Sequence, residues 1–225
     1  MNIAIETVIN LLHQTSFATL ATHSLEMPGY PFLSVLPFAP DERHCPVFLL
    51  SGLAEHTKNL RSDPRVGFLV VQPHEGDVQA GARLTLLGHV APLTPSDGLV
   101  DRYLRYQPSA QRYLRLADFG FFRLQPKAAR MIEGFGRMGW VKTQSLLDTA
   151  VLSLAEEANL LNRTGTDLPA ETTLLGVDPY GIDLEIARTR RRLQFEHAPV
   201  AIDAVSAAAS SLLKHSLDGS GALIL

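Results

Sequence analysis

The sequence predicts an α+β protein in which an antiparallel six-stranded β-barrel is followed by a small α-β-β-β-α domain. Up to about residue 135, six strand-like segments follow one another with short turns between them. No βαβ alternation joins these segments, which argues against a parallel sheet. Near residue 142 the pattern changes to helix, three strands and helix. We therefore expect two domains, over residues 1–142 and 143–225.

The composition is that of a globular protein with no evident nucleic-acid or membrane partner. Hydrophobic residues make up 46% of the 225 residues and charged residues 19%, and the net charge is −3. The single cysteine, Cys45, excludes an internal disulfide framework, and we interpret it as a packing residue. The N-terminus lacks a basic region, and no apolar run approaches the roughly 18 residues of a membrane span. These features predict a cytoplasmic protein.

The first elements follow from hydrophobic periodicity and turn residues. The N-terminal segment has a helical period, with Ile3, Val8 and Leu12 near one face. Small and β-branched residues predict a strand at 16–22. The next segments are two strands, 30–39 and 46–51, that we expect to form a hairpin with a loop of about five residues, and a short helix, 53–62, that ends before Asp63-Pro64.

The remaining segments of the barrel alternate in the same way between strand and helix signals. They are a strand at 66–72, a Gly-rich loop at about 75–81, a strand at 82–93, a bent helix at about 95–116 interrupted at Pro108, and a strand at 119–135.

The second domain is predicted from residue 143 onwards. A helix is expected at 145–162, two strands at 172–187 around the turn at 178–181, a third strand at 191–195 and a helix at 201–215. Four arginines lie close together here: Arg188, Arg190, Arg191 and Arg192. Strand alternation sends them to opposite faces, so we interpret them as a solvated, charge-protected strand edge.

Residues 51–58 form a polar, cationic segment between two apolar runs. Ser51 lies where a strand ends and a helix begins, so we expect the free N–H groups of residues 53–55 to converge there. Thr57, Lys58 or His56 would add charge-assisted bonds to a phosphate. The alternative is that Ser51 is an ordinary N-cap, Lys58 is solvated and Thr57 faces the barrel.

Two arginines elsewhere also suit an anionic cofactor. Arg83 lies on an apolar strand, where a guanidinium needs an anion or several acceptors. In GFGRMGW, residues 134–140, the glycines permit close backbone approach, Arg137 supplies a cation and Trp140 a flat ring. This segment equally fits an ordinary joint between domains.

The chain resembles a known family in the segments FATLATHS, GYPFLSVLPFA, PVFLLSGLAEHTKNLRSDPRVGFLV, ARLTLLGHV and DFGFFRLQPKAARMIEGFGRMGW. They are similar to the pyridoxamine 5′-phosphate oxidase-like FMN-binding split barrels, most of all to the haem-utilization (HugZ-type) branch. The segment LLGVDPYGIDLEIARTRRRLQFEHAPV resembles the small domain of that branch. The resemblance implies a homodimer with FMN or haem between the subunits, and the FMN phosphate at residues 51–58. It also implies that Asp118 is an acidic residue near the metal ligand. The alternative is that Asp118 only caps a turn before the strand.

One departure from the family concerns the iron ligand. Haem-degrading members of this branch usually take it from a histidine after the barrel. The corresponding segment, residues 152–165, has none, and no histidine occurs between His89 and His197. Glu156, Glu157 and Asn159 are poor replacements for an imidazole. His56, His197 and His215 remain the alternatives.

These observations predict an FMN-dependent oxidoreductase. The expected cofactor-binding residues are Ser51, His56, Thr57, Lys58, Asn59, Arg83 and Arg137. Asp118 is the candidate catalytic residue, and no metal is expected unless haem binds, in which case His56 is a candidate ligand. The alternatives are a haem-binding or haem-degrading protein that uses the same cleft, with Arg83 or Arg137 on the propionates, and a non-catalytic dimeric binding module. The substrate is not predicted.

Overall fold

The computed structural model describes residues 3–72, 77, 79–134, 136–164 and 168–218. Contacts along the chain divide it into two compact units, residues 1–149 and 150–225, which we call the barrel unit and the small unit. Within the described ranges, no helix is long and apolar enough to cross a membrane.

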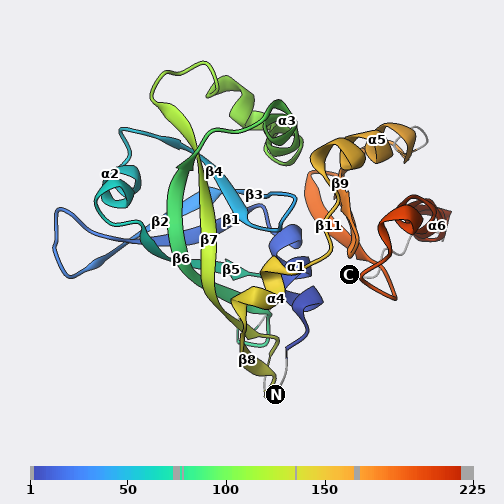
Figure 1. Cartoon of the computed structure of the whole chain (residues 1–225), viewed down its shortest axis with the longest axis horizontal. Helices are drawn as coiled ribbons and strands as arrows, with labels where there is room; N and C mark the ends of the chain where they lie inside the picture. Colours follow the sequence, from blue (N-terminus) through green and yellow to red (C-terminus); the bar gives the residue numbers. More distant parts are fainter. Residues whose placement is uncertain (1–2, 73–76, 78, 135, 165–167, 219–225) are drawn as a thin grey trace. The chain divides into compact units, whose positions relative to one another are not determined.

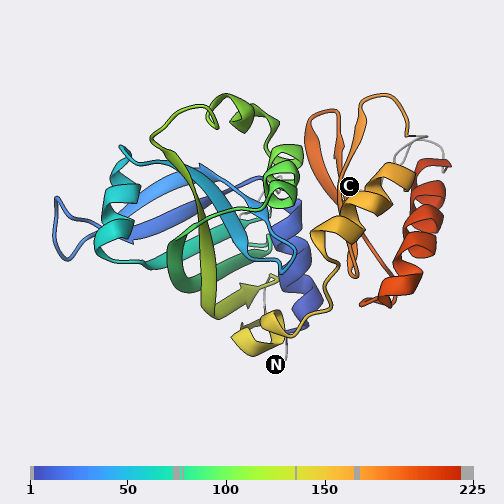
Figure 2. The ribbon, with the colours of Figure 1, turned by 45° about the horizontal axis from the view of Figure 1, so that its top comes forward.

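The barrel unit contains an antiparallel sheet that curls on itself, which confirms the predicted fold class (Figures 1 and 2). The sheet has eight strands among the described residues, two more than expected, in the order β2-β1-β5-β6-β7-β4-β3, with β8 paired to β7. They are β1 (Phe17–His23), β2 (Pro31–Pro37), β3 (Ala39–Pro40), β4 (Pro46–Ser51), β5 (Arg65–Val71), β6 (Arg83–Leu93), β7 (Phe119–Ile132) and β8 (Met138–Val141). The predicted Gly-rich loop falls partly on residues 73–76 and 78, which lie outside the described residues.

The helices of the barrel unit agree with the sequence pattern up to residue 116. They are α1 (Ile5–Gln14), α2 (Glu55–Ser62), α3 (Asp97–Tyr106), the 3-10 helix η1 (Pro108–Arg112) and α4 (Thr143–Leu147). Helix α1 buries Val8, Ile9, Leu11 and Leu12 together with the polar Asn10 and His13, so its burial extends beyond the single face that its period predicts. The bent helix is interrupted at Pro108 as expected, because proline has no N–H for a continuing helix and fits a first turn.

The predicted hairpin between residues 30–39 and 46–51 is confirmed only at its closed end, where the two-residue strand β3 pairs with β4 around a five-residue loop at 41–45. It is wrong for residues 31–37. Among the described residues, strand β2 pairs with β1, from Phe17 opposite Pro37 to His23 opposite Pro31. Proline has no N–H to donate to a neighbouring strand, so β2 ends at Pro37. The buried Phe38 connects β2, at one edge of the sheet, to β3, at the other edge.

Asp41 holds the loop between β3 and β4. Its Oδ1 accepts hydrogen bonds from the N–H groups of Arg43 and Cys45, at 2.9 and 2.8 Å, and its Oδ2 lies 2.7 Å from Arg123. Burial raises the pKa of this carboxyl to about 6, because desolvation outweighs the attraction of Arg123. Burial likewise raises the pKa of the Cys45 thiol to about 12, so this side chain packs as a neutral thiol.

The predicted single helix at 145–162 is also wrong. Two helices, α4 and α5 (Leu154–Thr164), are separated by residues 148–153. The reason is a capping box: Ser153 Oγ accepts from the N–H of Glu156 at 3.2 Å, while the Glu156 carboxylate accepts from the Ser153 N–H at 2.8 Å. This reciprocal pair starts a new helix inside an otherwise periodic segment.

The rest of the small unit matches the predicted order. It contains β9 (Thr172–Asp178), β10 (Gly181–Ile186), β11 (Thr189–Gln194), the 3-10 helix η3 (Ile202–Ala204) and α6 (Val205–Asp218). The strands form an antiparallel sheet in the order β11-β10-β9. Its core brings together residues from strands and helices: Leu152, Val177, Ile182, Leu184, Phe195, Val205, Ala209 and Leu213.

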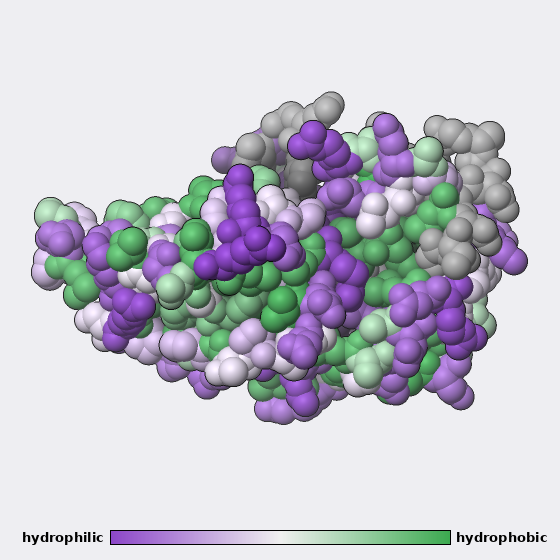
Figure 3. Space-filling view, turned by 90° about the horizontal axis from the view of Figure 1, so that it is seen from above, coloured by the Kyte–Doolittle hydropathy of each residue, from purple (hydrophilic) through white to green (hydrophobic). Residues whose placement is uncertain are grey.

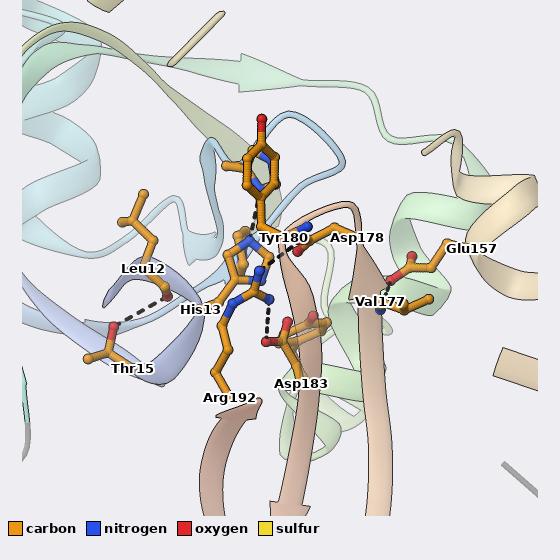
Figure 4. A network of polar contacts seen from close by, with 12 residues as sticks. Leu12, His13, Thr15, Glu157, Val177, Asp178, Tyr180, Asp183 and Arg192 are labelled. Carbon is orange, nitrogen blue, oxygen red and sulfur yellow. Dashed lines mark hydrogen bonds and ion pairs between the residues drawn. The ribbon is translucent and has the colours of Figure 1, made fainter. Parts of the chain in front are cut away.

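The interpretation of the arginine cluster as a solvated edge is wrong for Arg192. This guanidinium is buried and lies 2.8 Å from Asp178 and 2.7 Å from Asp183 (Figure 4). The register places Arg192 directly opposite Asp183 on β10, which turns it to the covered face of the sheet. Both carboxylates help to compensate for the desolvation of the guanidinium.

We expect Arg192→Met to destabilise the small unit by about 3–5 kcal/mol, because it leaves two buried carboxylates without their cation. Chemical denaturation of the full chain measures the effect. The matched control is Arg191→Met at the exposed neighbouring position, where a change within about 0.5 kcal/mol is expected. Equal stability of the two variants would contradict the structural role of Arg192.

We expect Asp41 to make stability fall as the pH rises from about 4 to about 6. Its pKa is raised to about 6 in the folded chain, so in this window the folded state binds more protons than the unfolded state. Over this pH range the free energy of unfolding should fall by about 3 kcal/mol through Asp41. Denaturant unfolding across a pH series measures it: the free energy of unfolding of the wild type minus that of Asp41→Asn should decrease up to pH 6 and then stay constant. A constant difference throughout would rule out the raised pKa.

Candidate functional site

A pocket of about 300 Å³ opens in the barrel unit where β2 and β4 end and α2 begins, beside α3 and η1. Figure 1 labels the strands and the helices α2 and α3. The walls of the pocket are mostly apolar and aromatic. The lining residues are Leu36, Pro37, Leu49, Leu50, Ser51, Ala54, His56, Tyr103, Gln107, Ser109, Ala110, Tyr113 and Phe119. Two of the predicted site residues, Ser51 and His56, are therefore brought together here.

Helix α2 is fixed beside this pocket by the buried Asn59. The amide nitrogen of Asn59 donates to Thr22 Oγ1 at 3.0 Å, and its amide oxygen accepts from the Leu25 N–H at 3.0 Å. This bidentate contact ties the helix to β1. Asn59, expected to bind the cofactor, thus uses its side chain to position α2.

The backbone N–H groups expected to be free near Ser51 are largely used within the chain. The Leu53 N–H donates to Ser51 Oγ at 3.1 Å, and the Ala54 N–H donates to the Ser51 carbonyl at 3.2 Å. The Gly52 N–H donates to the carbonyl of Asp118 at 2.6 Å. The prediction of free donors at Ser51 is therefore wrong for Leu53 and Ala54.

Asp118 places a carboxylate at this junction. Ser51 Oγ donates to Asp118 Oδ2 at 2.6 Å, so the serine hydroxyl already binds an anionic group. Asp118 lies in the turn before β7 that the Phe119 N–H closes by donating to the Leu116 carbonyl. A phosphate at the same hydroxyl would meet a like charge, which opposes its binding.

The side chains that follow His56 point in different directions. Thr57 is buried, and its hydroxyl has no hydrogen-bond partner within the part of the chain that the structure describes. Lys58 is exposed and lies 3.5 Å from Glu55, one helical turn away. Neither residue lines the pocket. The alternative in which Thr57 faces the barrel and Lys58 is solvated matches this arrangement.

His56 is the residue of the pocket whose side chain is best suited to ligate a metal. Its Nδ1 lies 3.2 Å from Ser34 Oγ on β2. Burial lowers the pKa of the imidazole, which favours the neutral form. Its Nε2 makes no hydrogen bond to any residue in the described ranges. A neutral imidazole with one nitrogen held and the other open is suited to ligate a metal.

Arg83 and Arg137 lie away from this pocket. Ser51 pairs with Phe119 at the start of the 14-residue strand β7, whereas Arg83 pairs with Ile132 at its end. Arg83 donates to the carbonyl groups of Gln79 and Gly81, at 3.0 and 3.3 Å. The exposed Arg137 lies 2.9 Å from Glu133. Within one chain, the predicted site residues thus fall into two groups at opposite ends of β7.

Two other cations, missed by the sequence analysis, flank the pocket. Arg112 lies over the ring of Tyr113, 4.7 Å from its centroid, and Tyr113 stacks on Phe119 at 4.9 Å. Arg61 donates to the carbonyl of Gly52 at 3.3 Å, beside Ser51. The interleaved arginines and aromatics of QRYLRLADFGFF, residues 111–122, are a signal that would have indicated this wall.

The comparisons with known proteins identify the family of this barrel. The family model described as the CREG β-barrel matches residues 6–147. The chain belongs to this family. The predicted resemblance to the haem-utilization branch of the pyridoxamine 5′-phosphate oxidase-like split barrels is confirmed by this match together with the relatives described next.

Two relatives of this CREG-type barrel carry names that describe an activity. The chain is 32% identical over 132 residues to the non-canonical heme oxygenase HOZ, chloroplastic, of Arabidopsis thaliana, a match that covers 58% of this chain and 40% of the plant protein. It is 28% identical over 137 residues to heme oxygenase HutZ of Vibrio cholerae, covering 58% of this chain and 77% of that protein. The match thus spans less than half of the plant relative.

A solved structure extends the likeness in fold beyond the barrel. A heme binding protein from Mycobacterium smegmatis is 24% identical, with a TM-score of 0.62, and the match covers 96% of this chain and 98% of that chain. At this identity the likeness establishes the fold: a CREG-type barrel followed by a small mixed domain.

Proposed function

We propose that the barrel unit binds haem in the pocket beside α2, with His56 as the iron ligand, and that the protein acts on haem as a haem oxygenase-like enzyme. The observation that carries the proposal is the half-buried imidazole of His56 on the wall of an apolar and aromatic pocket. The names of the two relatives, both heme oxygenases, support haem as the substrate.

The other residues of the pocket suit the two kinds of surface that haem presents. Leu36, Leu49 and Leu50 offer apolar contacts to the macrocycle, and Tyr113 and Phe119 add aromatic surface to the pocket. Arg61 and Arg112, at the edge of the pocket, are placed to pair with propionates. Such a pocket encloses one part of a large planar ligand, and the rest needs a second surface.

FMN fits the same residues less well. Its phosphate needs converging donors, and those around Ser51 are used by the chain itself. The carboxylate of Asp118, 2.6 Å from Ser51 Oγ, would repel a phosphate dianion. Haem needs no donor at this hydroxyl, which is why we favour it over the flavin.

We also propose that the protein is a homodimer. On the outer face of the sheet, Phe17, Leu33 and Val35 are 63%, 61% and 68% exposed. The register places Val35 beside Thr19 and Leu33 beside Ala21, so these side chains form a contiguous apolar strip across β1 and β2. Hydrophobic residues also reach the surface among hydrophilic ones in the left half of Figure 3, which belongs to the barrel unit. An exposed apolar strip of this kind is typical of an interface.

We expect His56→Ala to lose the haem spectrum of the wild type and to weaken hemin binding by about tenfold or more, because the iron loses its ligand. A spectroscopic titration of the full chain with hemin measures both. The matched controls are His197→Ala and His215→Ala in the small unit, which should bind as the wild type does. Loss of binding in either control instead of His56→Ala would move the ligand, and binding of FMN but not hemin would overturn the proposal.

We expect the double variant Leu33→Asp and Val35→Asp to be monomeric, because two charges in an apolar interface lose hydration without gaining a partner. Sedimentation equilibrium compares it with the wild type, for which a mass of two chains is expected. Leu53→Asp, at a residue 76% exposed next to α2 and off the strip, is the control that should stay dimeric. A monomeric wild type would refute the dimer.

A further inference from the structure

Ser34 occupies a position on β2 from which it faces α2. Residues of β2 alternate, so that Leu33 and Val35 are exposed, while Ser34 and Leu36 are less exposed and share the other face. Leu36 lines the pocket. Ser34 pairs with Leu20 on β1, whose side chain is buried. The serine hydroxyl is therefore carried on the side of the strand that looks toward the barrel and the pocket.

Helix α2 rests on the edge strand β2 and on its neighbour β1 through two polar contacts on one face of the helix. Asn59 binds Thr22 on β1, and His56, three residues earlier, lies 3.2 Å from Ser34 Oγ on β2. Residues three apart lie on the same side of a helix, so the two contacts together set its rotation. The imidazole of His56 is thus held at one edge by β2 while the ring lines the pocket.

The contact between His56 and Ser34 allows two tautomers with opposite consequences. If Nδ1–H donates to Ser34 Oγ, Nε2 keeps its lone pair and can ligate a metal. If the serine hydroxyl donates to Nδ1, the ring proton sits on Nε2 and blocks ligation. The first tautomer is the one that presents the Nε2 lone pair to the pocket that His56 lines, and Ser34 Oγ is the acceptor that the Nδ1–H then requires.

We infer that Ser34 is a positioning residue that selects the Nδ1–H tautomer of His56 and so presents Nε2 to the pocket as a ligand. The identity of the ligated metal as haem iron rests on the proposed function, whereas the tautomer does not.

Two variants of the same shape isolate the hydroxyl. Ser34→Thr keeps an oxygen on Cβ, and Ser34→Val replaces that oxygen with a methyl group; both are β-branched and suit a strand. Ser34→Ala is a third variant without added bulk. We expect Ser34→Thr to behave as the wild type, and the other two to lose the preference for Nδ1–H.

Nuclear magnetic resonance of the full chain, labelled with ¹⁵N-histidine and free of haem, reads the tautomer directly. His56 is assigned by its absence in His56→Ala. The Nδ1–H pattern is expected in the wild type and in Ser34→Thr, and a shift toward Nε2–H in Ser34→Val and Ser34→Ala. An Nε2–H ring in the wild type, or no change in both variants without the hydroxyl, overturns the inference.

A hemin titration of the same variants tests the consequence for binding. Loss of a partner that orients a ligating histidine weakens metal binding by about 10–100-fold, so Ser34→Val and Ser34→Ala should bind hemin correspondingly less tightly than Ser34→Thr. If Ser34→Val and Ser34→Ala bind hemin as tightly as the wild type while His56→Ala loses affinity for hemin, the positioning role of Ser34 is refuted. Unchanged affinity in His56→Ala itself refutes the proposed iron ligand instead, and the tautomer measurement then still decides the role of Ser34.

Discussion

The docking of α2 on the first two strands of the barrel is the constraint on which the candidate site depends. Asn59 satisfies a side-chain hydroxyl on β1 and a backbone N–H just beyond it, in a setting where buried polar groups must be paired. One turn earlier, His56 reaches β2. Because both contacts lie on one face of a two-turn helix, its rotation is set. The rotation of α2 in turn sets the positions of the pocket wall, the His56 imidazole and the turn at Ser51.

The carboxylate of Asp118 is the feature that favours haem over FMN, the two ligands that the sequence suggests. Hydroxyls and backbone N–H groups at a strand-to-helix junction are a general anion site. Here Asp118 lies beside β4, and its carboxylate and carbonyl take the Ser51 hydroxyl and the Gly52 N–H. What remains of the site is an imidazole, an apolar wall and two flanking arginines. That combination suits a planar, metal-bearing dicarboxylate better than a phosphate ester.

The order of elements could be predicted because hydrophobic period and turn residues are local signals. The strands at β5, β6 and β7 and the helices α1 and α2 lie close to where the pattern placed them. The errors have local causes that compete with periodicity. Pro37 ended a strand that looked continuous, and the capping box at Ser153 and Glu156 started a second helix within one apolar pattern. Both signals are present in the sequence and were outweighed by the period.

The sequence by itself determined the fold class, the resemblance to a family of split barrels and the presence of Ser51 and His56 at a strand-to-helix junction. Tertiary structure decided which side chains meet: Asp118 at Ser51, Ser34 at His56, and Arg192 between two aspartates. It also separated Arg83 from Ser51 along β7. The physical reason is that periodicity reports the face on which a residue lies, whereas contacts between residues far apart in the chain depend on strand register and sheet curvature.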